Sequence, residues 1–527
     1  MRDFLTQMSY DAWVLPALLL IPLAGALLLL VNGALSSDDG TVESAPSARM
    51  IALVVFVIEF VVSMGLWWSY DPAGPRWQAT FDHWWIIPWN ARLSMGIDGI
   101  SLMMVLLTTV IMPLAVLGSW TSIRVKVRSY YALMLVLTTG MLGVFVARDM
   151  LFFYLMWEIM LIPMYFIIGI WGGERRVYAS IKFFIYTTAG SLLMLVGIVY
   201  LWIRSPVPGM GLPASFDYDR LLTIAHTHTA ALWLFGAFFL AFAVKTPMFP
   251  FHTWLPDAHV EAPTAGSVIP ASLMLKMGTY GFLRFAIPLF PTAALTPWVR
   301  TTVLTLAVIG IIYGALVAMV QPDFKKLVAY SSVSHLGFVV LGIFALTQQS
   351  VQGAMMVMIN HGISTGALFL LIGMLYERRH TRLIAAYGGI ARSVPLFSAL
   401  LVLVSFSSIG LPSTNGFVGE FLVLLGSYET HPYFTLFATT AVIWAAAYLL
   451  WGIQGIVFNP LDKKENEHIS DLNARELTVM GVLVAAIFWI GIYPQPILRR
   501  MESSSAYFVH SVEQHQTEMN TASREAR

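Results

Sequence analysis

Long runs of apolar residues with almost no charge recur along nearly the whole chain. The first two clear runs cover residues 13–31 and 51–68. Each approaches the roughly 20 residues that a helix needs to cross the hydrocarbon core of a bilayer. Hydrophobic residues make up 58% of the 527 residues and charged residues only 11%, so a water-soluble core could not hide this much apolar surface. The sequence therefore predicts an all-α protein that crosses a membrane many times.

Fourteen transmembrane spans are predicted, and two of them are interrupted. The spans cover residues 13–31, 51–68, 100–120, 130–147, 150–171, 178–203, 230–250, 264–290, 298–320, 326–346, 351–376, 394–427, 432–458 and 477–498. The seventh contains AVKTPMFP at residues 243–250, and the twelfth contains SIGLPSTNG at residues 408–416. Proline removes a backbone donor and breaks a helix. We therefore expect helices 7 and 12 to be broken in the middle of the membrane.

The two interruptions suggest an internal repeat. Pro247 and Pro412 are 165 residues apart, about the length of five spans with their loops. A unit of five spans reverses its direction in the membrane, so the second unit would be inverted relative to the first. We expect three N-terminal helices in residues 1–127, inverted five-helix repeats in residues 128–292 and 293–460, and a last helix with a C-terminal tail in residues 461–527.

Lysine and arginine are distributed unevenly between the predicted loops. Counted from the N-terminus, the odd-numbered loops carry fifteen of them and the even-numbered loops six. By the positive-inside rule the odd-numbered loops face the cytoplasm. Because the number of spans is even, both termini are then expected outside. Residues 70–98 are rich in tryptophan and are expected to form a loop at the headgroup interface.

Ionisable residues inside the predicted spans are the candidates for function. They are Glu59, Glu158, Lys182, Lys245, Lys276, Arg284, His335, His361 and Glu420. A charged side chain at the centre of a span costs about 2.5–3.5 kcal/mol on insertion scales. Residues that carry this cost are therefore functional hypotheses by default. Glu158 lies in the middle of the fifth span, and Lys245 and Glu420 lie beside the two interruptions.

These residue types suit a proton relay. A carboxylate nearby favours the charged form of a lysine, whereas removal from water favours the neutral form. The two effects can be balanced so that a small change nearby releases the proton. Lys276 repeats this pattern in the eighth span. His335 and His361 can pass a proton through either ring nitrogen near neutral pH.

Several of these residues allow a simpler interpretation. Buried Glu and Lys residues could form structural ion pairs between helices. Lys182 and Arg284 could extend toward the headgroups, and Glu59 has no evident partner, so a structural or interfacial role is expected for it.

Two further sites allow a cofactor. His335 and His361 could be hydrogen-bonded core residues or could together hold a haem. Asp257 and His259 in WLPDAH could suggest a metal site, although we expect a loop turn or a helix cap there. The chain has no cysteine, which excludes disulfides, thiolate metal sites and iron–sulfur clusters. Its net charge of +1 argues against a nucleic-acid partner.

Six motifs resemble those of the antiporter-like membrane subunits of proton-pumping NADH:quinone oxidoreductase, respiratory complex I. They are WEIMLIPM at 157–164, AVKTP at 243–247, WLPDAH at 254–259, APTAGS at 262–267, SSVSHLG at 331–337 and GFVGEF at 416–421. The resemblance runs from about residue 95 to residue 500. The first 50 residues and the tail after Pro496 depart from it. Sister subunits of this family carry lysine in the twelfth span, where this chain carries Glu420.

The resemblance implies a role for each candidate residue. Glu158 and Lys245 would be the coupled pair of the input half-channel, Lys276 the central lysine, His335 and His361 the bridge along the axis, Glu420 the last site before release outside, and Lys182 a possible further member. It also implies a subunit of an enzyme complex that holds no metal, cofactor or redox centre itself.

Partners and location follow from the same resemblance. NADH, FMN, iron–sulfur clusters and quinone would belong to other subunits of the complex. The partners would be the other membrane-arm subunits, including the sister antiporter-like subunits L and N, within the lipid bilayer of a bacterial inner membrane. Both termini would then be periplasmic. Quinone reduction elsewhere in the complex would drive protons through the buried Glu, Lys and His residues.

Two other functions remain open from the sequence. The same fold occurs in multisubunit sodium/proton antiporters, but sodium prefers oxygen ligands, and a mixture of Lys, Glu and His suits protons better. A purely structural membrane scaffold would not need nine ionisable residues inside its spans.

Overall fold

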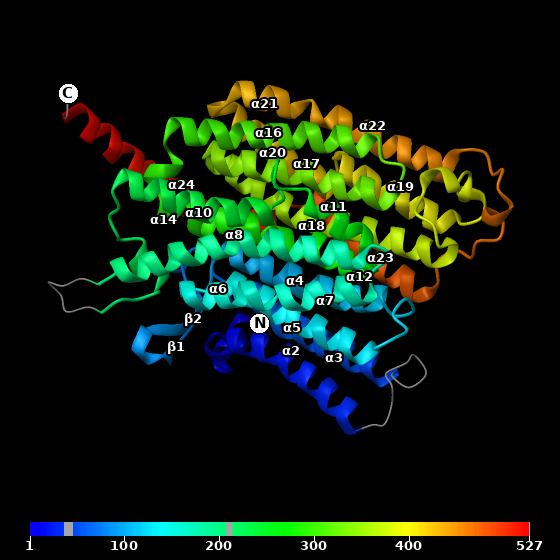
Figure 1. Cartoon of the computed structure of the whole chain (residues 1–527), viewed down its shortest axis with the longest axis horizontal. Coiled ribbons are helices and arrows are strands. Elements are labelled where there is room, and N and C mark those ends of the chain that lie inside the picture. Colours follow the sequence, from blue (N-terminus) through cyan, green and yellow to red (C-terminus); the bar gives the residue numbers. More distant parts are fainter. Residues whose placement is uncertain (36–45, 207–212, 526–527) are drawn as a thin grey trace.

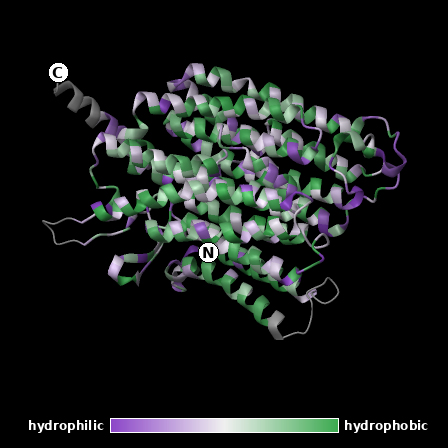
Figure 2. Cartoon of the chain, viewed as in Figure 1, coloured by the Kyte–Doolittle hydropathy of each residue, from purple (hydrophilic) through white to green (hydrophobic). Residues whose placement is uncertain are grey.

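A computed structural model describes residues 1–35, 46–206 and 213–525. Helices run side by side along the long axis of the molecule (Figure 1). Within this described part, twelve helices are long and apolar enough to cross a membrane. Apolar residues cover the helices along most of their length, and hydrophilic residues gather at the loops (Figure 2). The prediction of a polytopic all-helical membrane protein is therefore confirmed.

The first half of the chain contains the peripheral helices, a hairpin and the first broken span. Its elements are α1 (Arg2–Gln7), α2 (Tyr10–Leu35), α3 (Pro46–Ser69), β1 (Gln78–Ile86), η1 (Ile87–Trp89), β2 (Ala91–Ile97), α4 (Gly99–Gly118), α5 (Val127–Val146), α6 (Met150–Ile159), α7 (Leu161–Trp171), α8 (Arg176–Arg204), α9 (Tyr218–Leu221), α10 (His228–Lys245) and α11 (Trp254–Glu261).

The second half contains the central helices and the second broken span. Its elements are α12 (Thr264–Ile269), η3 (Pro270–Met274), α13 (Leu275–Gly281), η4 (Phe282–Ala286), α14 (Ile287–Leu289), α15 (Pro291–Ala294), α16 (Pro297–Met319), α17 (Phe324–Ala345), α18 (Gln348–Arg379), η5 (Ile384–Ala386), η6 (Ile390–Arg392), α19 (Pro395–Ile409), α20 (Asn415–Thr430), α21 (Pro432–Thr439), α22 (Ala441–Ile453), η7 (Gln454–Phe458), η8 (Lys464–Asn466), α23 (Ala474–Ile492) and α24 (Gln495–Glu525). Here η3, η4 and η7 are π turns, and η1, η5, η6 and η8 are 3-10 turns.

Helices α17 and α18 form the centre of the bundle. The most apolar window of α18 is 100% buried and that of α17 is 94% buried, whereas the windows of α3 and α23 are 28% and 33% buried. Peripheral helices therefore leave most of their apolar surface for lipid or for neighbouring proteins. The polar residues within these buried windows therefore lie inside the protein.

The two broken spans have the predicted form. Helix α10 ends at Lys245, and α11 begins at Trp254. The carbonyl of Val244, which Pro247 and its neighbours leave without a helical donor, accepts a hydrogen bond from Trp254 Nε1 at 2.8 Å. Helix α19 ends at Ile409, where Gly410 adopts φ 88°, and α20 begins at Asn415. The left-handed conformation of Gly410 stops the helix without steric cost.

The eighth predicted span, residues 264–290, is a helix interrupted in a different way. Two π turns, η3 and η4, lie on either side of the regular segment α13. Single π turns inside α-helices occur frequently at functional sites. The segment between them begins at Leu275 and places Lys276 in its first turn.

Two segments differ from the sequence prediction. The expected tryptophan-rich loop is an antiparallel hairpin, in which β1 pairs with β2 and Phe81 lies opposite Met95. Its aromatic-rich strands favour this pairing, and Asn90 supplies the left-handed turn residue at φ 53°. The expected C-terminal tail is instead the helix α24, and Ser504 Oγ accepts a hydrogen bond from Gly99 N at 2.8 Å.

The loops separate into two groups at opposite ends of the bundle. At the hairpin end, Met95 bridges to Ala147 and Asp149 bridges to Asp217, so the even-numbered loops lie together. At the far end, Asp323 bridges to Leu383 and joins two odd-numbered loops. The names hairpin end and far end are used below for these two ends.

Candidate functional site

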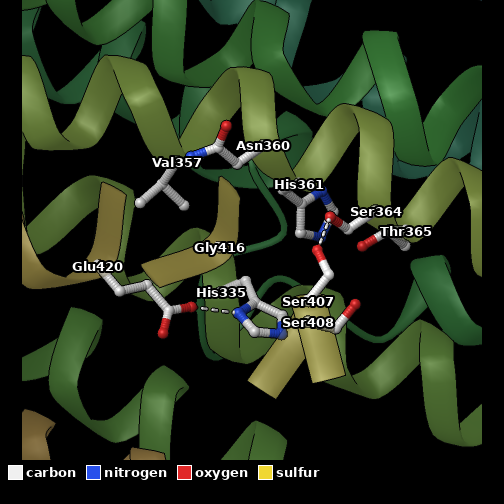
Figure 3. A pocket seen from close by; sticks show the side chains of 10 residues that line it. All are labelled: His335, Val357, Asn360, His361, Ser364, Thr365, Ser407, Ser408, Gly416 and Glu420. Carbon is white, nitrogen blue, oxygen red and sulfur yellow. Dashed lines mark hydrogen bonds and ion pairs between the residues drawn. The ribbon is translucent and has the colours of Figure 1, made fainter. Parts of the chain in front are cut away.

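A small polar cavity lies at the centre of the bundle, between α17, α18 and the break that joins α19 to α20 (Figure 3). Its volume is about 20 Å³. A cavity needs roughly 10–15 Å³ on this measure to hold one water molecule. Two histidines and one glutamate line it, together with hydroxyl and amide side chains. The site is therefore lined by polar side chains and is large enough for about one water.

His335 and Glu420 are in direct contact at one side of the cavity. His335 Nδ1 lies 2.7 Å from Glu420 Oε1 (Figure 3). The side chains are 9% and 13% exposed. His335 comes from the middle of α17, and Glu420 lies in the second turn of α20, directly after the break. Because α20 begins at the break, the Glu420 carboxylate lies near the start of a helix and inside the bundle.

Lys276 and His361 are in direct contact on the other side of the cavity. Lys276 Nζ lies 2.7 Å from His361 Nδ1 and also donates to the carbonyl of Ala271. Lys276 is completely buried, and among the described residues it has no carboxylate within ion-pair distance. If the ammonium donates to Nδ1, the ring proton of His361 lies on Nε2. Among the described residues that nitrogen has no hydrogen-bond partner.

A short gap between the two histidine rings separates the Lys276–His361 contact from the His335–Glu420 contact. The ring centroids of His335 and His361 are 5.7 Å apart, with the rings inclined at 62°. Both rings line the cavity. The gap is too wide for a direct hydrogen bond between the nitrogens but suits a bridge through one water molecule.

Side chains around the break hold the cavity in place. Ser364 Oγ and Ser407 Oγ are 2.8 Å apart, and both donate to Asn415 Oδ1. Asn360 and Asn415 each donate from Nδ2 to the other's backbone carbonyl. These bonds tie α18 to both sides of the broken span. Sequence reasoning missed them because serine and asparagine inside a span carry no charge and stand out little.

Glu158 and Lys245 lie in the first half of the molecule and do not touch. Lys245 is 1% exposed, and Nζ has no hydrogen-bond partner within the described part of the chain. It lies 5.5 Å from the ring centroid of Trp157 and 5.6 Å from that of Phe183. Glu158 is near enough to act on it electrostatically, although no ion pair forms between them. Their coupling remains a prediction.

Lys182 has a partner that the sequence did not reveal. Lys182 Nζ lies 2.7 Å from Asp257 Oδ2, so the lysine joins α8 to α11 and does not simply extend toward the headgroups. Next to this pair, Tyr186 Oη and Thr253 Oγ1 are 2.9 Å apart. The expectation of a loop turn or cap at Asp257 is wrong, because this residue is part of the helix α11.

Three further ionisable residues singled out from the sequence take three different positions. His259 stacks on Phe369 with ring centroids 4.9 Å apart. Arg284 is 3% exposed and pairs with Asp98 at 2.6 Å, so the expected extension toward the headgroups is wrong. Glu59 is fully buried, and neither carboxyl oxygen has a partner among the described residues.

Neither cofactor alternative fits the geometry. The space between His335 and His361 is about 20 Å³, which is far too small for a haem, and each histidine already bonds another side chain through Nδ1. Among the described residues, no group of three or more His, Asp or Glu side chains is arranged to hold a metal ion. Asp257 bonds Lys182, and His259 stacks on an aromatic ring.

One carboxyl outside the spans has an altered proton affinity. Asp149 precedes α6 and accepts hydrogen bonds from Leu151 N and Phe152 N, and also from Arg92 N. Burial raises the pKa of Asp149 to about 6, and these three bonds only partly oppose the effect of burial. Asp217 nearby adds to the rise.

Comparison with known proteins identifies a family. Residues 147–475 match the family described as "NADH:quinone oxidoreductase/Mrp antiporter, TM". The NADH-quinone oxidoreductase subunit M of Rhodobacter capsulatus is 45% identical over 496 residues, which are 93% of this chain and 95% of that protein. This likeness extends the resemblance that the six motifs had indicated.

Solved structures show the same fold. A chain of respiratory complex I from Thermus thermophilus with bound NADH matches with a TM-score of 0.84 and 31% identity, over 95% of this chain and 99% of that chain. A chain of the Mrp complex from Dietzia sp. DQ12-45-1b matches with a TM-score of 0.80 but only 16% identity, over 95% and 99% of the two chains. The Mrp likeness shows the fold alone.

Proposed function

The chain belongs to the NADH:quinone oxidoreductase/Mrp antiporter family and is an antiporter-like membrane subunit of NADH:quinone oxidoreductase, and we propose that it carries protons across the membrane along a buried relay. The relay consists of Glu158, Lys245, Lys276, His361, His335 and Glu420. The observation that carries the proposal is the 2.7 Å contact between Lys276 Nζ and His361 Nδ1, both buried at the centre of the bundle.

Each contact in the middle of the relay suits one proton transfer. Lys276 gives a proton to His361 Nδ1, and His361 releases its other proton from Nε2 toward the cavity. A water molecule there passes a proton to Nε2 of His335, because Nδ1 of His335 already faces Glu420. His335 then protonates Glu420 from Nδ1. One transfer leaves the ring proton of His361 on Nδ1 and that of His335 on Nε2, so both rings must return to their starting tautomers before the next proton passes.

The final carboxylate gives the relay a direction. A lysine is neutral without the transported proton (empty) and positive with it (loaded). Glu420 is negative when empty and neutral when loaded. An empty Glu420 therefore attracts the proton from Lys276 through the two histidines. Loading Glu420 removes a negative charge and does not create a positive one, which lowers the cost of holding the proton in a buried site. We propose that Glu420 releases its proton to the outside.

The input half starts at the far end of the bundle. The Lys182–Asp257 pair and the neighbouring hydroxyls of Tyr186 and Thr253 provide exchangeable protons there. Lys245 is a fully buried acceptor beyond them. Glu158, which acts on Lys245 without touching it, stabilises the protonated lysine when it is itself ionised. A change in the charge of Glu158 would then load or unload Lys245.

The energy needed for each step is within reach of such charge changes. Moving one proton against 100 mV costs about 2.3 kcal/mol. Two unit charges 4 Å apart interact by about 4 kcal/mol at the effective dielectric constant of about 20 that suits partly screened protein sites. Quinone reduction in another subunit would supply the initial charge change, and the contacts along α13, α18 and α20 would transmit it.

The assembly and orientation follow the same proposal. We place the far end, with its fifteen Lys and Arg residues, in the cytoplasm of a bacterial cell and both termini in the periplasm. The neighbours would be other membrane-arm subunits, including the sister subunits L and N, which together with the remaining subunits would contribute NADH, FMN, iron–sulfur clusters and quinone. The two broken spans would be equivalent parts of inverted repeats in residues 128–292 and 293–460.

An ion-replacement experiment tests whether the transported ion is a proton. The complex is reconstituted into vesicles, and proton uptake per quinone reduced is measured in sodium, potassium and choline buffers. We expect the same proton uptake in all three, because the Lys276–His361 and His335–Glu420 contacts beside the cavity both involve nitrogen, which is a poor ligand for sodium. Proton uptake that disappears without sodium would overturn the proposal and favour a sodium/proton antiporter.

A further inference from the structure

A buried ion pair that the relay does not use lies toward the hairpin end of the helix that carries Lys276. Arg284 Nη2 lies 2.6 Å from Asp98 Oδ2, and the two side chains are 3% and 4% exposed. Arg284 follows Lys276 by eight residues, which is about 12 Å along the axis at roughly 1.5 Å per residue. Breaking a buried pair of this kind is costly, and keeping one requires good geometry and additional hydrogen bonds.

Hydroxyl groups connect this pair toward the level of Lys276. Arg284 Nε donates to Tyr280 Oη at 3.2 Å, and Arg284 Nη2 donates to Ser101 Oγ at 3.3 Å. Ser101 Oγ and Tyr280 Oη are themselves 3.2 Å apart. Tyr280 is one helical turn from Lys276. A polar cluster therefore lies between the level of Lys276 and the hairpin end, on the short route that runs along this span and not through Glu420.

The outer side of the pair is closed by more charged and aromatic groups. The guanidinium of Arg284 lies 4.7 Å from the ring centroid of Trp77, whose Nε1 donates to Asp219 at 3.1 Å. Asp219 also pairs with Arg148 at 2.7 Å and with Arg76 at 3.3 Å. The charges in this cluster are Arg76, Arg148, Arg284, Asp98 and Asp219. Asp217 lies near Arg148 and adds a third acidic group, so arginines and acidic residues balance in number, and Arg284 is the cation that follows Lys276 along the same span.

Arg284 is suited to stop a proton and unsuited to pass one. A guanidinium does not lose its proton in proteins, so it cannot act as an acceptor in a relay. A fixed positive charge on a narrow path repels an approaching proton. Asp98 holds the arginine in place and accepts bonds from Ile100 N and Ser101 N. Burial raises the pKa of Asp98, but the charge of Arg284, its hydrogen bond, the bond from Ser101 N and the charge of Arg76 together outweigh burial, so the pKa lies below its usual range.

Lys276 points away from this short route. Its ammonium bonds the carbonyl of Ala271, five residues toward the far end, and His361. An opening at Arg284 would connect the outside directly with the input half of the relay. Protons would then flow back across the membrane down the membrane potential. The energy that the complex had stored by pumping them would be lost.

We propose that the Arg284–Asp98 pair is an electrostatic seal, which closes the short route between Lys276 and the hairpin end so that protons cross only by way of His361, His335 and Glu420. The proposal rests on the relay and the orientation proposed above. It assigns to Arg284 a positioning role for the proton path, and it explains why a permanent charge is kept at this depth.

The test measures passive proton flux through the whole complex in vesicles, with an imposed pH gradient and without NADH. Arg284→Gln removes the fixed charge, and at an effective dielectric constant of about 20 the loss of one unit charge about 12 Å from Lys276 corresponds to roughly tenfold faster leakage. Arg284→Lys, which keeps the charge, should remain tight. Adding Lys276→Met to Arg284→Gln should remove the leak, since the relay is then interrupted.

Several results would overturn the seal. An assembled Arg284→Gln complex as tight as wild type would do so, and so would a leak that persists with Lys276→Met. Arg284→Gln combined with Asp98→Asn leaves no unpaired charge, so it decides the matter if the single variant does not assemble: a leak supports the seal, and tightness contradicts it. Lys276→Met alone, with the seal intact, tests the relay separately. Normal pumping in that variant would contradict the proposed function, whatever the leak measurements give.

Discussion

Lys276 and His361 are 85 residues apart in the sequence, and their Nζ and Nδ1 atoms are 2.7 Å apart in the structure. His335 and Glu420, on the other side of the cavity, are also 85 residues apart and also 2.7 Å from each other. The cavity between the two contacts has room for about one water molecule. Four candidate residues from four separate helical segments thus form two contacts. In one contact a histidine meets a lysine, and in the other a histidine meets a carboxylate.

Substitution of His361 should interrupt the relay in its middle. His361→Gln keeps a polar side chain of similar reach but cannot take up a proton and release another. General acid–base groups contribute about 100-fold to 10,000-fold to the steps they serve, so proton transfer through this subunit should fall by at least about 100-fold. Proton uptake per quinone reduced, measured in vesicles, gives the result. His380→Gln, at the exposed end of α18, is the matched control and should behave like wild type.

Glu158 should control the loading of Lys245 by charge and not by contact. Glu158→Gln removes the charge, and both quinone-linked electron flow and proton pumping should fall sharply while the complex still assembles. Glu158→Asp keeps the charge and moves it by one methylene group, so most activity should remain, because no direct ion pair has to be re-formed. Equal losses of proton pumping in Glu158→Gln and Glu158→Asp would show that the position of the carboxyl group matters and its charge does not. Normal pumping in Glu158→Gln would remove Glu158 from the relay.

The Lys182–Asp257 pair should matter as a pair. Asp257→Asn leaves the lysine without its partner, and Lys182→Met leaves the carboxylate alone, so each variant should slow proton uptake. The exchanged pair, Lys182→Asp with Asp257→Lys, restores opposite charges across the same 2.7 Å contact and should recover more than either single variant. Because the side chains are 19% and 28% exposed, the interaction is partly screened, and only about 1 kcal/mol or less of coupling is expected. An exchanged pair no better than the single variants would show that the contact is incidental.

Asp149 should make stability depend on pH in a defined direction. Its pKa of about 6 in the folded state lies above the usual value because of burial, so the folded chain holds this proton more tightly than the unfolded chain does. Stability therefore falls as pH rises from about 4 to about 6 and is level above that. Between pH 5 and pH 7 the free energy of unfolding falls by about 1 kcal/mol, since one pKa unit corresponds to about 1.36 kcal/mol.

The variant Asp149→Asn isolates this effect. It keeps a capping oxygen for α6 but does not titrate. Its midpoint of thermal unfolding, relative to wild type, should rise between pH 5 and pH 7. Melting curves that stay parallel across this range would mean that Asp149 is already ionised at pH 5.

The residues of the relay could be predicted because charge inside an apolar span is rare. Lys276, His335, His361 and Glu420 stood out from the sequence for this reason, and the breaks near Lys245 and Glu420 followed from proline and glycine. Their mutual contacts could not be predicted, since each joins segments that are far apart in the chain. No local pattern specifies which lysine meets which histidine.

The features that sequence analysis missed are those whose cause is tertiary. Arg284 was expected near the headgroups, but its partner Asp98 comes from a segment nearly two hundred residues earlier and buries it. Asp257 was expected in a loop turn or a helix cap, yet it pairs with Lys182 from within α11. Ser364 and Asn415, which support the cavity, carry no charge and did not stand out among ordinary polar residues.

Glu420 offers the most direct test of the central claim, that protons leave Lys276 through the histidines to a carboxylate on α20. Glu420→Gln leaves a polar group that cannot take a proton, whereas Glu420→Lys keeps a site that can. The measurement is proton uptake into vesicles per quinone reduced, with assembly checked on native gels. The account predicts that Gln blocks the path and that Lys retains partial activity. If both variants assemble and pump like wild type, Glu420 is not on the path and the account is wrong.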